Sequence, residues 1–190
     1  MQNLSGKEKM RLSRVESKNN IALFPARGGS KRIPRKNVRD FRGQPMIAWP
    51  IAAARESGLF EEIMVSTDDD EVAAIARSNG AEVPFRRPES LSNDQAGTEE
   101  VMLHLLNWLE ANGRLPEYFC CIYPTSPLIT SGIIKNVFES MKREGADSAF
   151  TAVAYPHPIW RALRRSDDGR AVYQWPEYID ARSQDLPEMI

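Results

Sequence analysis

Short apolar runs alternate with amphipathic helical patterns along most of this chain, and this alternation restricts the fold more than any other feature. The apolar runs lie at 21–24, 62–67, 81–85, 118–123 and 148–154. The helical patterns lie between them, at 46–57, 70–79, 98–111 and 131–144. Strands that alternate with helices pair in parallel, because each helix returns the chain to the same end of the sheet. We therefore predict an α/β fold: a doubly wound, mainly parallel sheet with helices on both faces.

Pro50 conflicts with the first of these helical patterns. Proline has no backbone N–H, and inside a helix its ring clashes with the preceding turn. We therefore expect this helix to kink at Pro50 or to begin later than residue 46.

The length of the chain limits how many domains it can form. Its 190 residues, 42% of them hydrophobic, suffice for one sizeable core but are few for two. Residues 1–19 are polar and charged and have no periodicity, so we predict a flexible N-terminal leader there. We predict a single domain over residues 20–190, with residues 158–180 as an excursion from it.

The sequence of this excursion is typical of a hairpin. Strand-like segments at 159–165 and 172–175 flank the turn sequence Ser166-Asp167-Asp168-Gly169. The region holds four aromatic residues: Trp160, Tyr173, Trp175 and Tyr178. These are too many for a two-stranded ribbon to bury alone. We therefore predict a protruding hairpin that forms a homodimer contact, with packing against its own domain as the alternative.

The loop after the first apolar run concentrates positive charge. Residues 25–37 read PARGGSKRIPRKN, and their basic side chains are Arg27, Lys31, Arg32, Arg35 and Lys36. Gly28 and Gly29 allow the backbone to turn sharply and bring N–H groups close to an anion. Several fixed cations are what a triphosphate requires. We predict a polyphosphate site supplied by all five cations, with a solvated basic loop as the alternative.

Two familiar phosphate-binding motifs do not occur in the sequence. There is no GxxxxGK[ST], and Gly28-Gly29 does not extend to GxGxxG. Neither a P-loop NTPase nor a dinucleotide-binding fold is therefore predicted.

Charge distribution and histidine content argue against two other classes of function. Residues 1–36 hold ten Lys/Arg against two acidic residues, although the net charge of the chain is −1. A local basic segment without interleaved aromatic residues favours a small anion over nucleic acid as the partner. The two histidines, His104 and His157, have no Cys or His at ligand spacing, which argues against histidine-based zinc chemistry.

The two cysteines, Cys120 and Cys121, are adjacent within an apolar run. Neighbouring side chains of a strand point to opposite faces, so we expect no disulfide between them. The sequence has neither a secretory segment nor an apolar stretch of membrane-spanning length. A cytoplasmic location without a membrane partner is the expectation.

Polar and basic residues follow three of the predicted strands at the point where each strand ends. These are the basic loop at 25–37, the run Ser66-Thr67-Asp68-Asp69-Asp70, and the run Pro124-Thr125-Ser126-Pro127. In an open parallel sheet, ligands bind at the carboxyl ends of the strands. We therefore predict that the three strand ends form one site.

Several residues of this site have two interpretations. Asp68 could organise a metal or a sugar hydroxyl, but a capping box from Asp68 to Glu71 at a helix start is favoured. Thr125 and Ser126 could bind a substrate carboxylate or only shape a turn. Arg87 could bind a base, although the pattern alone favours a solvated side chain.

Four segments in order, PARGGSKRIPRKN, VSTDD, FRRPESLSND and YPTSPL, resemble the acylneuraminate cytidylyltransferase family, the CMP-sialic acid synthetases. The resemblance extends from residue 21 to about residue 186. It implies a Rossmann-like, nucleotide-diphospho-sugar transferase-like fold and a homodimer. It also implies a Mg²⁺-dependent enzyme that couples CTP to a nine-carbon 2-keto sugar acid and releases pyrophosphate.

The segments CCIYPTSP, HPIWRAL and ARSQDLPE look most like the pseudaminic acid branch of this family, which serves surface glycan or flagellin glycosylation. Tyr123 stands where the sialic acid enzymes usually carry Gln. The alternatives are cytidylyltransferases for sialic, legionaminic or 3-deoxy-manno-octulosonic acid, or for a sugar 1-phosphate, and a noncatalytic CTP-binding homologue.

The resemblance also implies residue roles. Arg27 and Lys36 would hold the triphosphate and act in catalysis, by offsetting charge while the anomeric hydroxyl of the acid attacks the α-phosphorus in line. The other residues expected around CTP are Gly28, Gly29, Ser30, Lys31, Asn37, Arg87, Ala96 and Thr98. Those expected around the sugar acid are Tyr123, Thr125, Ser126, Arg182 and Gln184.

The family's chain continues beyond a segment like 182–186 into a last strand, a magnesium-binding Asp-x-Asp and a closing helix. This sequence stops at Ile190. We therefore expect the C-terminal part of the family domain to be absent, the metal ligands to be unknown and the activity of these 190 residues to be in doubt.

Overall fold

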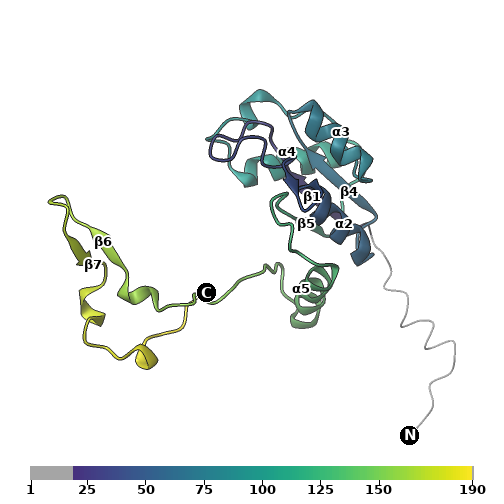
Figure 1. Cartoon of the computed structure of the whole chain (residues 1–190). Helices are drawn as coiled ribbons and strands as arrows, with labels where there is room; N and C mark the ends of the chain where they lie inside the picture. Colours follow the sequence, from purple (N-terminus) through teal and green to yellow (C-terminus); the bar gives the residue numbers. More distant parts are fainter. Residues whose placement is uncertain (1–18, 190) are drawn as a thin grey trace, which may run out of the picture.

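A three-stranded parallel sheet forms the centre of the fold (Figure 1). The computed structural model describes residues 19–189, so nearly all of the predicted leader lies outside the described residues. The sheet has the order β4-β1-β5, with β1 at Ile21–Pro25, β4 at Glu62–Ser66 and β5 at Phe119–Cys121. β1 pairs with both neighbours in parallel, as the alternation of strand and helix patterns predicts.

Within the described part of the chain, four α-helices cover both faces of this sheet: α2 (Ala48–Ser57), α3 (Asp70–Ser78), α4 (Thr98–Ala111) and α5 (Ser131–Glu144). Ala22 and Phe24 of β1 belong to a core that also contains residues of α2, α3 and α5. Ile21 and Leu23 belong to a second core, formed with α4. Because successive side chains of a strand point to opposite faces, β1 supplies both cores. The doubly wound α/β fold is confirmed.

Local signals at the helix ends account for the helix bounds. Gly58 ends α2 in the left-handed conformation, with φ of 63°. α2 begins at Ala48, two residues later than its pattern predicts, which places Pro50 in the first turn. The N–H groups of the first turn have no partner within the helix, so proline costs little there. The Thr130 side chain accepts a hydrogen bond of 3.2 Å from the Ile133 N–H and so caps α5.

Two predictions of local structure are wrong. The N-cap of α3 is Asp69, whose carboxylate accepts a 2.9 Å hydrogen bond from the Val72 N–H, rather than Asp68. Residues 148–154 form no strand, and Phe150 and Val153 are 82% and 85% exposed. A strand needs a neighbour for its backbone groups, and none lies beside this segment in the described chain.

The predicted strand at 81–85 forms in part. This segment runs beside β4 through two isolated parallel bridges, which join Met64 to Glu82 and Thr67 to Arg86. A small hairpin of β2 (Asp40–Phe41) and β3 (Gln44–Pro45), which the sequence patterns did not predict, precedes α2.

The C-terminal residues form an arm, here defined as residues 155–189, which stands apart from the α/β body (Figure 1). Its antiparallel hairpin joins β6 (Leu163–Arg165) to β7 (Ala171–Tyr173), as predicted. The Trp160 ring lies 5.4 Å from the Trp175 ring and 5.0 Å from the Tyr178 ring, between centroids. The arm is closed by a 3.0 Å hydrogen bond from the Tyr155 N–H to the Met189 carbonyl.

Short 3-10 helices complete the described chain: η1 (Glu89–Leu91), η2 (Ile159–Arg161), η3 (Pro176–Tyr178) and η4 (Ser183–Asp185). Within residues 19–189, no helix has both the length and the apolar character needed to cross a bilayer.

The packing of α4 gives a stability prediction. Leu105 is fully buried in the core between α4 and the sheet, whereas Leu103 on the same helix is 58% exposed. Leu105→Ala should lower the free energy of unfolding by about 2–5 kcal/mol, because it removes buried methyl groups and leaves a cavity. Leu103→Ala should change it by less than about 0.5 kcal/mol. Urea denaturation of the two variants tests this, and equal losses would contradict the assignment of α4 to the core.

Candidate functional site

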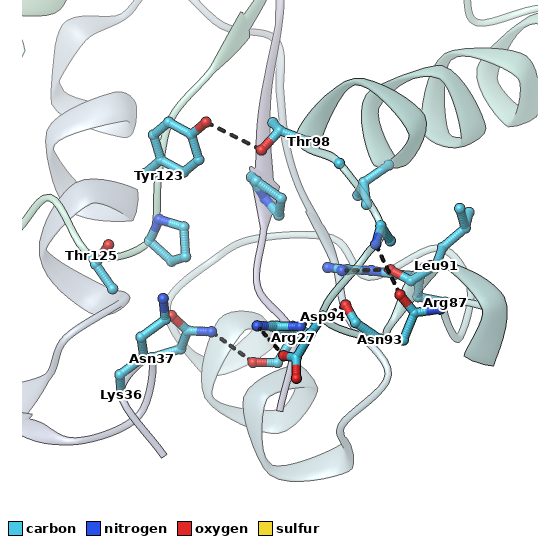
Figure 2. Close-up of a pocket in the computed structure, with 15 residues that line it drawn as sticks. Arg27, Lys36, Asn37, Arg87, Leu91, Asn93, Asp94, Thr98, Tyr123 and Thr125 are labelled. Atoms are coloured by element: carbon cyan, nitrogen blue, oxygen red, sulfur yellow. Dashed lines mark hydrogen bonds and ion pairs between the residues drawn. The ribbon is translucent and has the colours of Figure 1, made fainter. Parts of the chain in front are cut away.

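A cleft of about 190 Å³ opens at the carboxyl ends of the strands (Figure 2). One side is formed by the loop after β1, which contributes Arg27, Lys36 and Asn37. The opposite side comes from the segment 87–98, which ends at the start of α4. The loop after β5 closes the cleft with Tyr123, Pro124 and Thr125. The loops that follow β1 and β5 therefore meet here as predicted. The run 66–70 at the end of β4, predicted as the third part of the site, does not line the cleft.

Asn37 holds the loop after β1 in place. It is only 3% exposed, and its amide donates a 2.8 Å hydrogen bond to the Arg27 carbonyl. The Asn37 carbonyl accepts a 2.9 Å hydrogen bond from the Ile47 N–H, which ties the loop to the start of α2. No donor within residues 19–189 reaches the buried Asn37 Oδ1. Since buried polar atoms are normally paired, Asn37 is able to accept a hydrogen bond from a ligand in the cleft.

Arg35 does not join the cations of the cleft, although the sequence predicts that it does. Its guanidinium forms ion pairs with Asp69 and Glu71 at the start of α3. The Arg35 backbone is in the left-handed region, with φ of 56°. Hydrogen bonding to Arg35 lowers the pKa of Asp69 below its usual value. Arg35 therefore anchors the loop to α3, so the prediction that all five basic residues supply the site is wrong.

The two glycines of this loop have different surroundings. The Gly28 N–H donates a 3.0 Å hydrogen bond to Asp68 Oδ1. A Cβ atom at Gly28 would lie 2.5 Å from Asp69 Oδ2 and 2.6 Å from Asp69 Cβ, whereas one at Gly29 would meet no atom within 4 Å. Gly28 is thus required for the close approach of the loop to α3. Asp68, which the sequence linked to a cap or a ligand, binds the loop backbone.

Asp94 lies against two of the predicted phosphate-binding cations. Its Oδ1 is 2.8 Å from Arg27 Nη2, and its Oδ2 pairs with Lys31 Nζ. Hydrogen bonding to Lys31, assisted by Arg27, lowers the pKa of Asp94 below its usual value. Arg27 also donates a 2.6 Å hydrogen bond from Nη1 to the Asn93 carbonyl (Figure 2).

Arg87 is the most buried cation of the cleft, with 4% of its surface exposed. Its Nε donates a 3.1 Å hydrogen bond to Ser66 Oγ, and its Nη2 donates to the Ser66 carbonyl at the end of β4. Burial lowers the Arg87 pKa to about 10, so the guanidinium remains charged at neutral pH. The sequence pattern favoured a solvated side chain, and that interpretation is wrong.

Tyr123 and Thr98 connect two walls of the cleft. Their hydroxyl oxygens are 3.2 Å apart and form a hydrogen bond between the loop after β5 and the first residue of α4 (Figure 2). The Gly97 N–H, just before α4, donates a 2.9 Å hydrogen bond to Glu100 Oε2. The hydrogen bond thus joins Thr98, which is expected to contact CTP, to Tyr123, which is expected to contact the sugar acid.

Not every predicted site residue lines the cleft. Gly28, Gly29, Ser30 and Lys31 lie on the loop beside it, and Ser126 forms a turn through a 3.1 Å hydrogen bond from its N–H to the Tyr123 carbonyl. Arg182 and Gln184 lie on the arm, where Arg182 Nε is 2.7 Å from Asp185 Oδ2. The roles of these residues remain predictions.

Residue-level reasoning missed the contribution of the loop before α4. Asn93 Oδ1 accepts hydrogen bonds of 2.8 and 2.9 Å from the Gln95 and Ala96 N–H groups, which fixes the turn that carries Asp94. The Asn-Asp pair is a recognisable turn signal, but it does not indicate which cations the carboxylate meets.

The described residues do not form a magnesium site by themselves. Within residues 19–189, no group of three or more His, Cys, Asp or Glu side chains could hold a metal ion. The only carboxylate among the described residues that line the cleft belongs to Asp94, and two cations engage it.

Comparison with known proteins finds one matching family and several named relatives. A family described as Cytidylyltransferase matches residues 21–165. Pseudaminic acid cytidylyltransferase of Campylobacter jejuni subsp. jejuni serotype O:23/36 (strain 81-176) is 39% identical over 168 residues, which is 88% of this chain and 72% of that protein. CMP-N,N'-diacetyllegionaminic acid synthase of Legionella pneumophila is 35% identical over 140 residues, 74% of this chain and 60% of that protein.

Among solved structures, CMP:2-keto-3-deoxy-manno-octonic acid synthetase complexed with CTP resembles this chain with a TM-score of 0.56. The match is 23% identical and covers 67% of this chain and 49% of that one. At this identity the likeness concerns the fold alone.

The different surroundings of Gly28 and Gly29 give a matched pair of variants. Gly28→Ala should lower the free energy of unfolding by about 1–3 kcal/mol, because the new methyl group overlaps Asp69, which caps α3 and binds Arg35. Gly29→Ala should lower it by less than about 0.5 kcal/mol. Chemical denaturation compares them, and equal stabilities would show that the loop does not pack against α3.

Proposed function

Because this chain belongs to the cytidylyltransferase family, we propose that it couples CTP to a nonulosonic acid, with pseudaminic acid favoured, and releases pyrophosphate. The observation that supports this most is the composition of the cleft. Arg27, Lys36 and Arg87 face the same cavity as Tyr123 and Thr125. A nucleotide site and an acid site in one cavity are what a direct transfer between them requires.

The proposed reaction is a single in-line displacement. The anomeric oxygen of the sugar acid forms a bond to the α-phosphorus of CTP and transfers its proton to water. The bond from the α-phosphorus to the oxygen that bridges to the β-phosphorus breaks, and pyrophosphate leaves with that electron pair. Arg27 and Lys36 would offset the charge that grows on the leaving group, as fixed cations do in phosphoryl transfer.

Arg87 suits the base-binding end of the cleft. Ser66 fixes the guanidinium from the end of β4, and the group stays charged at neutral pH. Cytosine offers two acceptors, its carbonyl oxygen and its ring nitrogen, to such a donor. Asn37 Oδ1, which has no donor within the described residues, would accept from a hydroxyl or amino group of the same nucleotide.

The acid-binding end is proposed to comprise Tyr123, Thr125 and Ser126, together with Arg182 and Gln184 of the arm. Tyr123 is already oriented by its hydrogen bond to Thr98. The relative from Campylobacter, at 39% identity, supports pseudaminic acid as the acceptor. The relative from Legionella, at 35%, supports legionaminic acid as an alternative acceptor.

Magnesium enters this proposal through the nucleotide. Proteins usually hold Mg²⁺ by one or two carboxylates together with substrate phosphates. When bound, it would neutralise phosphate charge. The described residues do not fit a protein-only magnesium site, so we assign no step of the transfer to the metal.

We also propose that the arm contributes a homodimer contact and that the protein acts in the cytoplasm. Several apolar side chains of the arm are exposed, among them Leu163 and Ile179, at 58% and 47%. Exposed apolar residues on a projecting element are typical of an interface.

The direct test of the function is pyrophosphate release from CTP with pseudaminic, legionaminic, sialic and 3-deoxy-manno-octulosonic acids offered separately. Release with pseudaminic acid alone is expected. Binding of CTP without release from any acid would instead favour a noncatalytic CTP-binding homologue.

Arg27 and Arg86 allow a matched test of the phosphate site. Both arginines pair with an aspartate, but only Arg27 lines the cleft. Arg27→Ala should lower kcat/KM by roughly 100-fold or more, because a fixed cation near the transferring phosphate is lost. Arg86→Ala should leave kcat/KM nearly unchanged. Near-normal turnover by Arg27→Ala would remove Arg27 from the mechanism.

The arm supplies the prediction for self-association. Replacing Trp160 and Trp175 with Ser should shift the sedimentation profile toward monomer, because it removes the central aromatic pair. Since that pair also stabilises the arm, Leu163→Asp provides a second variant at an exposed position. An unchanged profile for both variants would place the dimer contact elsewhere.

A further inference from the structure

We propose that Asp94 is an internal competitor of the polyphosphate: its carboxylate pairs with the same cations, Arg27 and Lys31, that the phosphates of the substrate would bind. The proposal deepens the proposed function, on which it rests for the identity of the anion. It assigns to the loop before α4 a role in setting how tightly the cleft holds the nucleotide.

The geometry of the carboxylate is that of a bound anion. Each of its two oxygens meets a different cation: Oδ1 lies 2.8 Å from Arg27 Nη2, and Oδ2 pairs with Lys31 Nζ. A phosphate group likewise presents several oxygens on one centre and is bound by Arg and Lys through charge-assisted hydrogen bonds. Asp94 therefore satisfies the same donors that a phosphate would use.

The turn around Asp94 keeps the carboxylate at this place. Asn93 Oδ1 accepts from the Gln95 and Ala96 N–H groups, and the Asn93 carbonyl accepts from Arg27 Nη1. Arg27 is thus bound to two consecutive residues of one turn. Several hydrogen bonds and ion pairs thus hold the negative charge of Asp94 against Arg27 and Lys31 at the edge of the cleft.

The same contacts are weak enough to be displaced. The side chains of Arg27 and Asp94 are 30% and 42% exposed, and Lys31 is 84% exposed. Ion pairs that are open to solvent contribute little to stability and are screened by salt. A triphosphate, with several negative charges, can therefore replace one carboxylate on these cations.

Charge repulsion determines whether Asp94 strengthens or weakens the binding of a polyphosphate. A phosphate that binds Arg27 and Lys31 comes close to the charge of Asp94, and like charges at short distance repel. Replacing Asp94 with Asn keeps the shape and a side-chain acceptor for Arg27 but removes the charge. Polyphosphate binding should then become tighter, whereas binding of uncharged cytidine should not change.

Calorimetric titration of the full chain at low salt tests the proposal with tripolyphosphate, CTP and cytidine as ligands. Asp94→Asn should bind tripolyphosphate and CTP roughly threefold or more tightly than the wild-type chain. Asp94→Glu, which retains the charge, should bind them like the wild type. Asp70→Asn is the matched control, because Asp70 pairs with Arg86 outside the cleft.

Unchanged or weaker polyphosphate binding by Asp94→Asn would overturn the proposal and make Asp94 a residue that merely orients Arg27. Equal tightening of cytidine would also overturn it, because the effect would then not be electrostatic. Failure of the proposed function looks different: Asp94→Asn would still tighten the binding of tripolyphosphate and CTP, which supports the competitor role, but no sugar acid would release pyrophosphate from CTP. A chain that binds no polyphosphate at all would overturn both.

Discussion

The position of β1 between β4 and β5 is the constraint on which the rest of the structure depends. Because β1 pairs in parallel on both sides, the loops that follow β1 and β5 emerge at the same edge of the sheet. Its side chains alternate between two cores, so the helices on both faces hold this strand in register. The cleft exists because that arrangement brings the loop after β1, the segment before α4 and the loop after β5 together.

The acidic start of α3 links the sheet to the basic loop. Asp68 accepts the Gly28 N–H, and Asp69 both caps α3 and pairs with Arg35. Two neighbouring carboxylates thus bind the loop at Gly28 and at Arg35. Arg27 and Lys36, which lie just outside these two anchor points, line the cleft. The excess of basic residues in this loop therefore has two uses: one arginine is structural, and others supply the site.

Features that depend on local chemistry could be predicted from the sequence, and features that depend on distant partners could not. The bounds of α4 and α5 follow their patterns and caps closely. Residues 148–154 have a strand-like sequence but no neighbouring strand in the described chain. A preference for strand structure does not by itself supply the partner that backbone hydrogen bonds require. The buried position of Arg87 depends on its contact with Ser66, 21 residues away. Which of the three consecutive aspartates caps α3 depends on the helix geometry, which the sequence alone does not specify.

The adjacent cysteines of β5 have a consequence for how motions of this protein can be observed. Cys120 packs against the core formed with α2, α3 and α5, whereas Cys121 packs against the core formed with α4. Burial raises the pKa of both thiols, that of Cys120 to about 11. Both are therefore poor nucleophiles at neutral pH while the helices stay packed against the sheet. One strand therefore carries a separate reporter for each helical layer: the thiol that becomes reactive identifies the face from which the helices have separated.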